Sequence, residues 1–361
     1  MILTIIVFIL ILGLLIFAHE LGHFITAKRA GIKVEEFGFG FPPRVFGIKR
    51  GETIYSLNLI PLGGFVKIYG EEGEGKDDSR SFASRSIWQR FKILIAGVTF
   101  NFIFAALILS IGNFIGLPAA ISSGESDNNF RDIKVQIAEV ASNSPAEKAD
   151  IKTGDAIENL KFRNEKIKIN EIAEVQNFID THRGEEINII IARGKETTEK
   201  TLIPREDPPE GEGAVGIAMV KTGTVSYSWY ESIWRGILNT ITMTIAFIIA
   251  IFGIIKNLII GAPIIGGLAG PVGIASITGQ AVKLGFIYVI QLTAILSINL
   301  AIINAFPFPA LDGGRILFLI IEKIKGSAVS QNFEKRVHTI GFILLITLML
   351  FITFRDVVRI F

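Results

Sequence analysis

The sequence predicts a polytopic α-helical membrane protein with about four transmembrane helices and one inserted α+β domain. Two observations lead to this fold class. Half of the 361 residues are hydrophobic, and they gather into long blocks rather than the short runs of a soluble protein. Between two of these blocks, residues 130–204 instead show the strand, turn and helix patterns of a water-soluble domain.

The apolar blocks have the length of membrane spans. A hydrocarbon core needs roughly 20 apolar residues in a helix. The first block lacks the basic start and the small-residue cleavage site of a signal peptide, so we expect it to be a retained span. The blocks are residues 1–18, 93–117, 233–260, 284–306 and 339–354.

Composition argues against a nucleic-acid partner and against structures that need cysteine. The formal net charge is only +2, which gives no reason to expect nucleic acid as a partner. The chain has no cysteine, which excludes a disulfide framework and a thiolate metal site.

The polar stretch after the first block, residues 28–92, is rich in Lys and Arg. The positive-inside rule places it in the cytoplasm, so the first helix runs from outside to inside and the second returns. Within it, residues 53–70 alternate and are rich in β-formers, which predicts a membrane-associated β-loop. We interpret the charged run at residues 71–81 as a flexible, solvated connector.

Residues 130–205 predict an inserted domain outside the membrane. They suggest several strands, a short helix, and an amphipathic helix ended by Gly184. The Pro/Glu/Gly-rich residues that follow predict a linker. The expected organisation is residues 1–118, the first two spans with the β-loop; 130–205, the inserted domain; 206–228, the linker; 229–282, an interfacial helix and a Gly/Pro-rich segment; and 283–361, the last two spans.

The sequence HELGH, residues 19–23, ends the first apolar block with ionisable side chains. On a helix, His19 and His23 share one face, so both imidazoles can bind one metal ion. Glu20 lies beside them, where it can take a proton from a metal-bound water. Ionisable residues inside a membrane are rare and usually functional. The alternative is a pair of buried polar residues bonded to neighbouring helices.

A catalytic zinc ion takes three protein ligands. The extended motif with a third histidine is not present, because Arg29 stands at its position. We expect His182 and His338 to serve surface roles. Asp312 is the better candidate, since it follows an apolar block among prolines and glycines that break the helix. The alternative is an ordinary Asp-Gly turn at a helix end.

This assignment constrains the topology. Asp312 must reach the depth of the HELGH motif, so its helix must also run from outside to inside. We therefore predict that residues 229–260 lie along or partly in the outer interface, anchored by aromatic residues at their start. The alternative is that this helix spans and that residues 261–280, too rich in Gly and Pro for a regular helix, return as a re-entrant loop.

These residues resemble the site-2 metalloproteases, specifically the bacterial regulator-of-sigma-E protease type, over nearly the whole chain. HELGH resembles the zinc motif, and NAFPFPALDGG resembles the Asn-x-x-Pro-x-Pro-x-Leu-Asp-Gly signature that supplies the third ligand. IPLGGFVKI is similar to the re-entrant β-loop, LAGPVGIA to the segment before the third core helix, and AGVTFNFIFA to the Gly-x-x-x-Asn pattern, with Phe102 where a Pro is frequent. SPAEKADIKTGDAI resembles a PDZ domain, with Asp150 where a Gly is usual.

The resemblance implies a zinc-dependent endopeptidase of the bacterial inner membrane, with one PDZ domain on the extracytoplasmic side. Its partners would be the lipid bilayer and transmembrane substrates already trimmed by another protease, such as anti-sigma factors or remnant signal peptides. His19, His23 and Asp312 would hold Zn²⁺, and Glu20 would act as general base and acid. The implied substrate-binding residues are Asn299, Asn304, Pro307, Pro309, Leu62, Gly63, Gly64 and Phe65, although intramembrane Asn more often bonds neighbouring helices.

Two other classes of function remain as alternatives. One is a PDZ-bearing membrane scaffold or sensor with a structural metal site, against which Glu20 argues, because a structural site needs no base. The other is a metal transporter, but the spans lack further polar residues to form a path.

Overall fold

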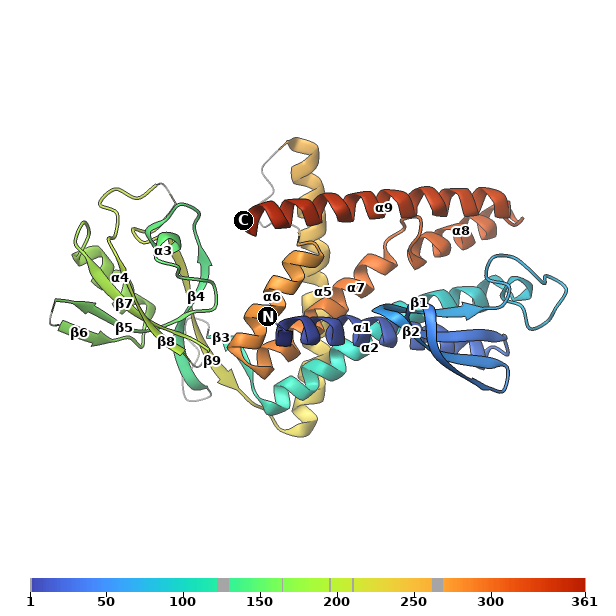
Figure 1. The fold of residues 1–361 in the computed structure, drawn as a ribbon, viewed down its shortest axis with the longest axis horizontal. Coiled ribbons are helices and arrows are strands. Elements are labelled where there is room, and N and C mark those ends of the chain that lie inside the picture. Colours follow the sequence, from blue (N-terminus) through green and yellow to red (C-terminus); the bar gives the residue numbers. More distant parts are fainter. Residues whose placement is uncertain are drawn as a thin grey trace. The chain divides into compact units, whose positions relative to one another are not determined.

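The computed structural model describes residues 2–121, 130–163, 165–194, 196–209, 211–261 and 269–360. The chain divides into two compact units, a helical one and a β-rich one, whose elements are labelled in Figure 1. The helical unit comprises Met1–Ile111, Ile233–Gly279 and Val289–Phe361. The β-rich unit comprises Gly112–Ser232 and Gln280–Tyr288.

Long apolar helices dominate the helical unit. Within the described chain, five helices are long and apolar enough to cross a membrane, which makes this a multi-pass membrane protein with an inserted β domain. Each expected apolar block forms one of them. They are α1 (Ile2–Arg29), α2 (Ile87–Ile115), α5 (Trp229–Ile260), α7 (Phe286–Ala305) and α9 (Gln331–Ile360).

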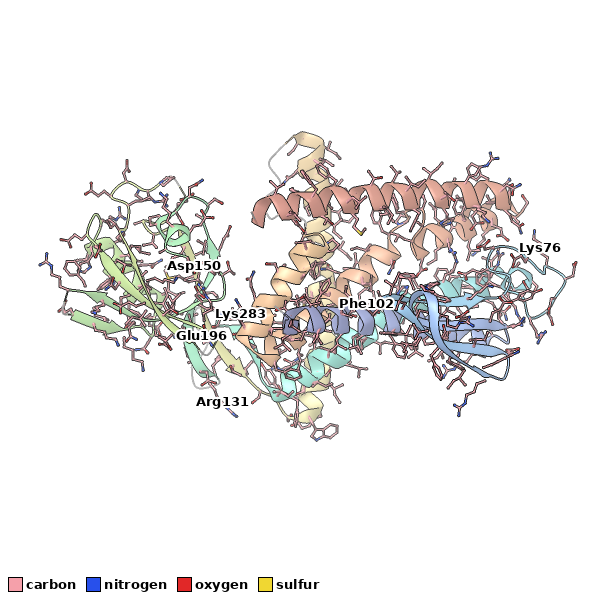
Figure 2. The ribbon with its side chains drawn as sticks, in the orientation of Figure 1. Lys76, Phe102, Arg131, Asp150, Glu196 and Lys283 are labelled. Carbon is pink, nitrogen blue, oxygen red and sulfur yellow. The ribbon has the colours of Figure 1, made fainter. Side chains whose placement is uncertain are left out.

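Helix α5 is the additional candidate beyond the expected four. It is one continuous helix of 32 residues, and Figure 1 shows it running crosswise to α1 and α9. Its middle packs through Met243 and Phe247 on a small cluster that includes Ala105 of α2 and Ile298 of α7. Phe102, labelled in Figure 2, packs against the same cluster. An aromatic ring therefore fills the space beside this cluster.

The Gly/Pro-rich segment differs from expectation. Its residues 262–268 lie outside the described residues, but Pro271–Leu284 form a regular helix, α6. Proline is tolerated at the first helical position, where its missing N–H needs no partner. The free N–H groups of Gly270 and Gly273 donate to the Asp356 carboxylate at 2.8 Å each, which compensates the helix N-terminus.

The predicted β-loop pairs with a strand that the sequence did not reveal. β1 (Val34–Arg50) and β2 (Thr53–Ile68) form an antiparallel sheet. Phe37 of β1 pairs with both Tyr55 and Val66 of β2. The first part of β1 therefore lies between the two ends of β2, and residues 64–68 form an edge.

The charged run after the β-loop is not a free connector. Glu71 pairs with Arg315 of α8 (Asp312–Lys325), and the Gly73 carbonyl accepts from Gln331 of α9 at 2.8 Å. Glu72 lies 3.3 Å from Lys335. The run is mostly exposed, as expected of a solvated connector, but two of its acidic side chains are paired with bases on two helices.

The β-rich unit is built on a seven-stranded sheet in the order β3-β9-β4-β5-β7-β8, with β6 beside β5. Its core consists of alternating strand residues such as Ile187, Ile189 and Ile191, none of them exposed. Strand β9 lies in the expected linker and pairs with β4, so the sheet extends beyond residue 205. The bounds are β3 Leu117–Ala120, β4 Arg131–Val140, α3 Pro145–Lys148, β5 Ala156–Phe162, β6 Glu165–Lys168, α4 Ile172–Thr181, β7 Ile187–Arg193, β8 Glu196–Leu202 and β9 Ile217–Val225.

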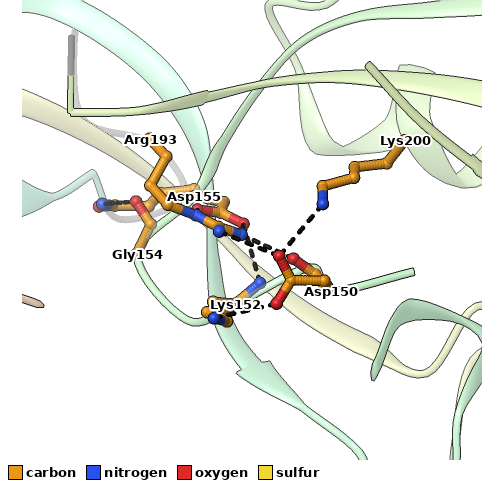
Figure 3. A network of polar contacts seen from close by, with 7 residues as sticks. Asp150, Lys152, Gly154, Asp155, Arg193 and Lys200 are labelled. Carbon is orange, nitrogen blue, oxygen red and sulfur yellow. Dashed lines mark hydrogen bonds and ion pairs between the residues drawn. The ribbon is translucent and has the colours of Figure 1, made fainter. Parts of the chain in front are cut away.

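An ionic network supports one unusual backbone position in this unit (Figure 3). Asp150 has a left-handed backbone with φ of +57°, which explains why glycine suits this position. Its carboxylate contacts Lys152 at 2.9 Å and Lys200 at 3.1 Å. Arg193 donates to the Asp150 carbonyl at 2.7 Å and forms a bidentate ion pair with the buried Asp155. The three basic groups hold the pKa of Asp150 well below its usual range, led by the hydrogen bond from Lys152.

Candidate metal centre

Helix α1 supplies two of the three expected ligands. His19 and His23 are one helical turn apart and are each 7% exposed. Their Nε2 atoms lie 3.2 Å from one another. The helix spacing therefore brings both imidazoles to one buried point, as the HELGH pattern predicts.

A sharp turn between α7 and α8 brings Asp312 to the same point. Its Oδ2 lies 3.0 Å from His19 Nε2 and 3.2 Å from His23 Nε2. The two glycines that follow it are required by packing, because a β-carbon on Gly313 or Gly314 would overlap carbonyl oxygens of the turn.

The three donor atoms fit a zinc ion. Tetrahedral zinc with bonds of about 2.0 Å requires ligand atoms about 3.3 Å apart. The three atoms are 3.0, 3.2 and 3.2 Å apart. Asp312 Oδ2 is buried and makes no hydrogen bond within the described structure. Buried lone pairs that converge at this spacing repel one another unless a cation lies between them, so the chemistry of the donor set suits a divalent metal.

The hydrogen-bond partner of Nδ1 in each histidine determines that Nε2 faces the other donor atoms. His23 Nδ1 lies 2.8 Å from the Ile93 carbonyl, so it carries the proton and leaves Nε2 free to ligate. His19 Nδ1 lies 3.3 Å from the side-chain amide of Asn101, whose Oδ1 is buried and has no hydrogen-bond partner among the described residues. Rotating that amide by 180° lets Oδ1 accept the His19 Nδ1 proton, an orientation that satisfies both groups.

Residues of α2 shape the space around the imidazoles. A β-carbon on Gly97 would overlap His23 Nε2 and lie 2.7 Å from His19 Cε1. Gly97 and Asn101 are four residues apart and face the same side of the helix. Reasoning from residue chemistry alone missed both, since only the family-like Gly-x-x-x-Asn spacing pointed to them.

Glu20 lies against the edge of the β-loop. Its carboxylate faces the backbone N–H of Val66. A β-carbon on Gly64 would lie 3.7 Å from Glu20 Cγ, so this glycine borders Glu20 directly. Gly63 takes a φ of +129° against Phe41, and Phe65 pairs with Gly38 in the sheet. The side chain of Leu62 lies outside the described residues.

The remaining expected substrate-binding residues lie on or after α7. Asn299 and Asn304 are half-buried, and neither side chain forms a hydrogen bond with the rest of the described chain. Pro307 is exposed, whereas Pro309 packs on Gly341 of α9. The two amides are thus available to a ligand rather than engaged with neighbouring helices.

The expectation of surface roles for the other two histidines is wrong. The His182 ring lies between Phe162 and Phe178, with centroids 4.2 and 4.4 Å away, and its Nδ1 bonds the Phe178 carbonyl. His338 Nδ1 accepts a hydrogen bond from the backbone N–H of Ala310 at 2.8 Å. Both imidazoles satisfy internal groups, which sequence position alone does not reveal.

Comparison with known proteins identifies the family. The model of peptidase family M50 matches residues 7–348. The chain is 38% identical to a putative zinc metalloprotease of Clostridium perfringens, over 95% of both chains. It is 31% identical to the zinc metalloprotease RasP of Bacillus licheniformis and 29% identical to the regulator of sigma-W protease RasP of Bacillus subtilis, each over 99% of both chains. The protein belongs to peptidase family M50, the site-2 proteases, and is a zinc metalloprotease that cleaves membrane proteins within the membrane.

Proposed function

We propose that His19, His23 and Asp312 hold the zinc ion of this protease and that Glu20 is its general base. The observation that carries the proposal is the buried triangle of two imidazole nitrogens and one carboxylate oxygen, with sides of 3.0 to 3.2 Å. A bound zinc ion supplies Lewis acidity that activates water near neutral pH and polarises a carbonyl.

The residues around the triangle transfer the proton and orient the two imidazoles. Glu20 takes a proton from the attacking water and later delivers it to the leaving amine nitrogen. Asn101 and the Ile93 carbonyl orient the two imidazoles through their Nδ1 atoms. A structural metal site in a scaffold or sensor would need no such base, so Glu20 favours the enzyme.

We further propose that the substrate is held as an extended strand at the edge of the β-loop, residues 64–68. An intact helix hides its peptide bonds, so a transmembrane segment must unwind before cleavage. The edge adjoins Glu20 through Val66 and Gly64, and main-chain pairing at a sheet edge suits an extended peptide of any sequence. The free amides of Asn299 and Asn304, together with Pro307 and Pro309, would contact the same peptide. Leu62, Gly63 and Phe65 would line the edge.

The substrates we propose are transmembrane segments already trimmed by another protease. The Bacillus subtilis relative is named for regulating sigma-W, which suggests an anti-sigma factor as one substrate, and remnant signal peptides are a second class. The expected location is the bacterial inner membrane, with the β-rich unit as an extracytoplasmic PDZ domain. The crosswise course of α5 supports an interfacial position for residues 229–260, with four helices spanning.

The decisive experiment replaces Glu20 by Gln, which keeps the shape and removes the base. The purified variant should retain one zinc ion per chain and lose cleavage of a transmembrane test substrate. Asp312→Ala should lose both zinc and cleavage. Undiminished cleavage by Glu20→Gln would contradict the proposed mechanism, and full zinc content in Asp312→Ala would contradict the ligand set.

The topology is tested separately, because the chain has no cysteine of its own. Single cysteines at Glu196 of the β-rich unit and at Lys76, both labelled in Figure 2 and exposed, are compared in intact cells. A membrane-impermeant thiol reagent should label Glu196→Cys from outside and Lys76→Cys only after permeabilisation. The reverse pattern would overturn the orientation.

A further inference from the structure

We infer that His338 is a positioning residue for Asp312, an inference that rests on the zinc site proposed above. His338 lies on α9, which contributes none of the proposed ligands. Its Nδ1 accepts the backbone N–H of Ala310 at 2.8 Å. Ala310 stands two residues before Asp312, so this bond connects the last long helix to the turn that carries the third ligand.

The turn at residues 306–311 needs outside support. Ala310 has a left-handed backbone with φ of +76°, which is sterically unfavourable for a residue other than glycine. The N–H groups of Phe308 and Leu311 bond within the turn, to carbonyls at 2.7 and 3.2 Å. Phe306 donates back to α7 at 3.0 Å.

The N–H of Ala310 is the one that remains to be satisfied in the turn. Pro307 and Pro309 have no N–H to donate. Ala310 is thus the one residue of the turn whose N–H is satisfied from another helix. Leaving this N–H unpaired in a part-buried position is unfavourable and frees the strained residue to relax. Relaxation there would move Asp312 away from the histidines.

The surroundings of His338 hold its ring in place. Phe318 of α8 packs on the ring with centroids 5.5 Å apart. Gly341, three residues further along α9, lets the helix approach, because a β-carbon there would lie 2.7 Å from the Pro309 carbonyl oxygen. Since Nδ1 accepts a hydrogen bond, it carries no proton, and the ring is the neutral tautomer with its hydrogen on Nε2. His338 and Gly341 together hold the turn against α9, the first by a hydrogen bond and the second by close packing.

Two amide substitutions separate an acceptor role from a packing role in the full-length, detergent-solubilised protein. In His338→Asn, Oδ1 takes the place of Nδ1 and can accept the Ala310 N–H. In His338→Gln, the oxygen lies near the position of Nε2 and cannot. We expect His338→Asn to bind zinc like the wild type and His338→Gln and His338→Leu to bind it roughly tenfold to a hundredfold more weakly, measured by chelator competition. The cobalt-substituted proteins should show an altered visible spectrum for Gln and Leu only.

A second substitution tests the connection through Ala310. Glycine adopts the left-handed backbone without the steric cost. Ala310→Gly combined with His338→Leu should therefore recover part of the lost zinc affinity. The control is Thr339→Val on the exposed side of α9, which should match the wild type.

The results distinguish this inference from the proposed site. Wild-type zinc affinity and cobalt spectrum in His338→Leu would overturn the positioning role, and so would equal losses in the Asn and Gln variants. Failure of the zinc site itself would appear instead as full zinc binding by Asp312→Ala. If His338→Leu does not fold, the Asn and Gln pair decides the outcome.

Discussion

Gly97 of α2 passes so close to His19 of α1 that a β-carbon in its place would lie 2.7 Å from the imidazole Cε1. The same carbon would overlap His23 Nε2. Gly22 of α1 is equally restricted, because its β-carbon would lie 2.8 Å from the Ala96 carbonyl carbon. The two helices thus meet through glycines at the level of the proposed zinc site, and neither position has space for a β-carbon.

Gly97→Ala should therefore abolish zinc binding without unfolding the protein. The added methyl group would occupy the space between the two imidazoles, and they cannot move apart without breaking the bond from His23 to Ile93. Zinc content of the purified variant measures the effect. Gly253→Ala on α5 is the matched control, since a β-carbon there would have no neighbour within 4 Å in the described part of the chain. A variant at Gly97 that retains a full zinc ion would contradict the close packing described here.

We expect zinc binding to require the side-chain oxygen of Asn101 rather than the size of its side chain. Asn101→Leu removes the acceptor for His19 Nδ1 and should weaken zinc binding by roughly tenfold to a hundredfold. Asn101→Asp keeps an acceptor of the same shape and should bind zinc at least as tightly as the wild type at neutral pH. Chelator competition compares the three proteins. Equal weakening in both variants would show that the amide nitrogen is the required group.

Local periodicity carried much of the prediction of the site. The spacing of His19 and His23 within one helical turn predicted two ligands, and the absence of the third histidine of the extended motif directed attention to Asp312. Gly97, Asn101 and His338 remained hidden to residue-by-residue reasoning. Each acts through a neighbour on a different helix, and such contacts have no spacing in the sequence.

The missed parts of the fold have similar causes. Residues 34–50 contain glycines and two prolines without clean alternation, so they did not read as a strand, although their partner did. Residues 271–284 contain helix breakers at positions that tolerate them, with Asp356 completing the N-terminus from far along the chain. The long apolar α5 has the composition of a span, and only its direction relative to α1 and α9 supports a position along the interface.

Substrate should lie along the edge of the β-loop that adjoins Glu20. The chain has no cysteine, so single cysteines can be placed in the Glu20→Gln background without further changes. We expect Lys67→Cys, on the edge strand, to form a disulfide with a cysteine near the cleavage site of a transmembrane test substrate. Lys49→Cys lies on the opposite edge of the same sheet and should not react. Equal crosslinking at both positions would rule out a specific strand register.

Asp150 should stabilise the β-rich unit in a way that depends on both backbone and pH. Asp150→Ala loses the ion pairs and keeps the left-handed strain, whereas Asp150→Gly loses only the ion pairs, so Ala should be less stable than Gly by about 1 kcal/mol. The pKa of Asp150 is lowered by Lys152, Lys200 and Arg193. A carboxyl whose folded-state pKa is depressed contributes stability above its ordinary pKa, near 3.8, and loses that contribution as the pH falls further.

The stability difference between wild type and Asp150→Gly should accordingly be constant from pH 7 to about pH 5 and shrink below about pH 4. Hydrogen exchange of β7 and β8 in the full-length protein measures this difference locally, because Arg193 and Lys200 belong to those strands. The effect should be modest, since the Asp150 side chain is 54% exposed and its ion pairs are screened by solvent. Added salt should reduce it at pH 7 in the same way as acid. A difference that is independent of both pH and salt would mean that Asp150 acts through its backbone conformation alone, and that the three basic residues around it are incidental neighbours.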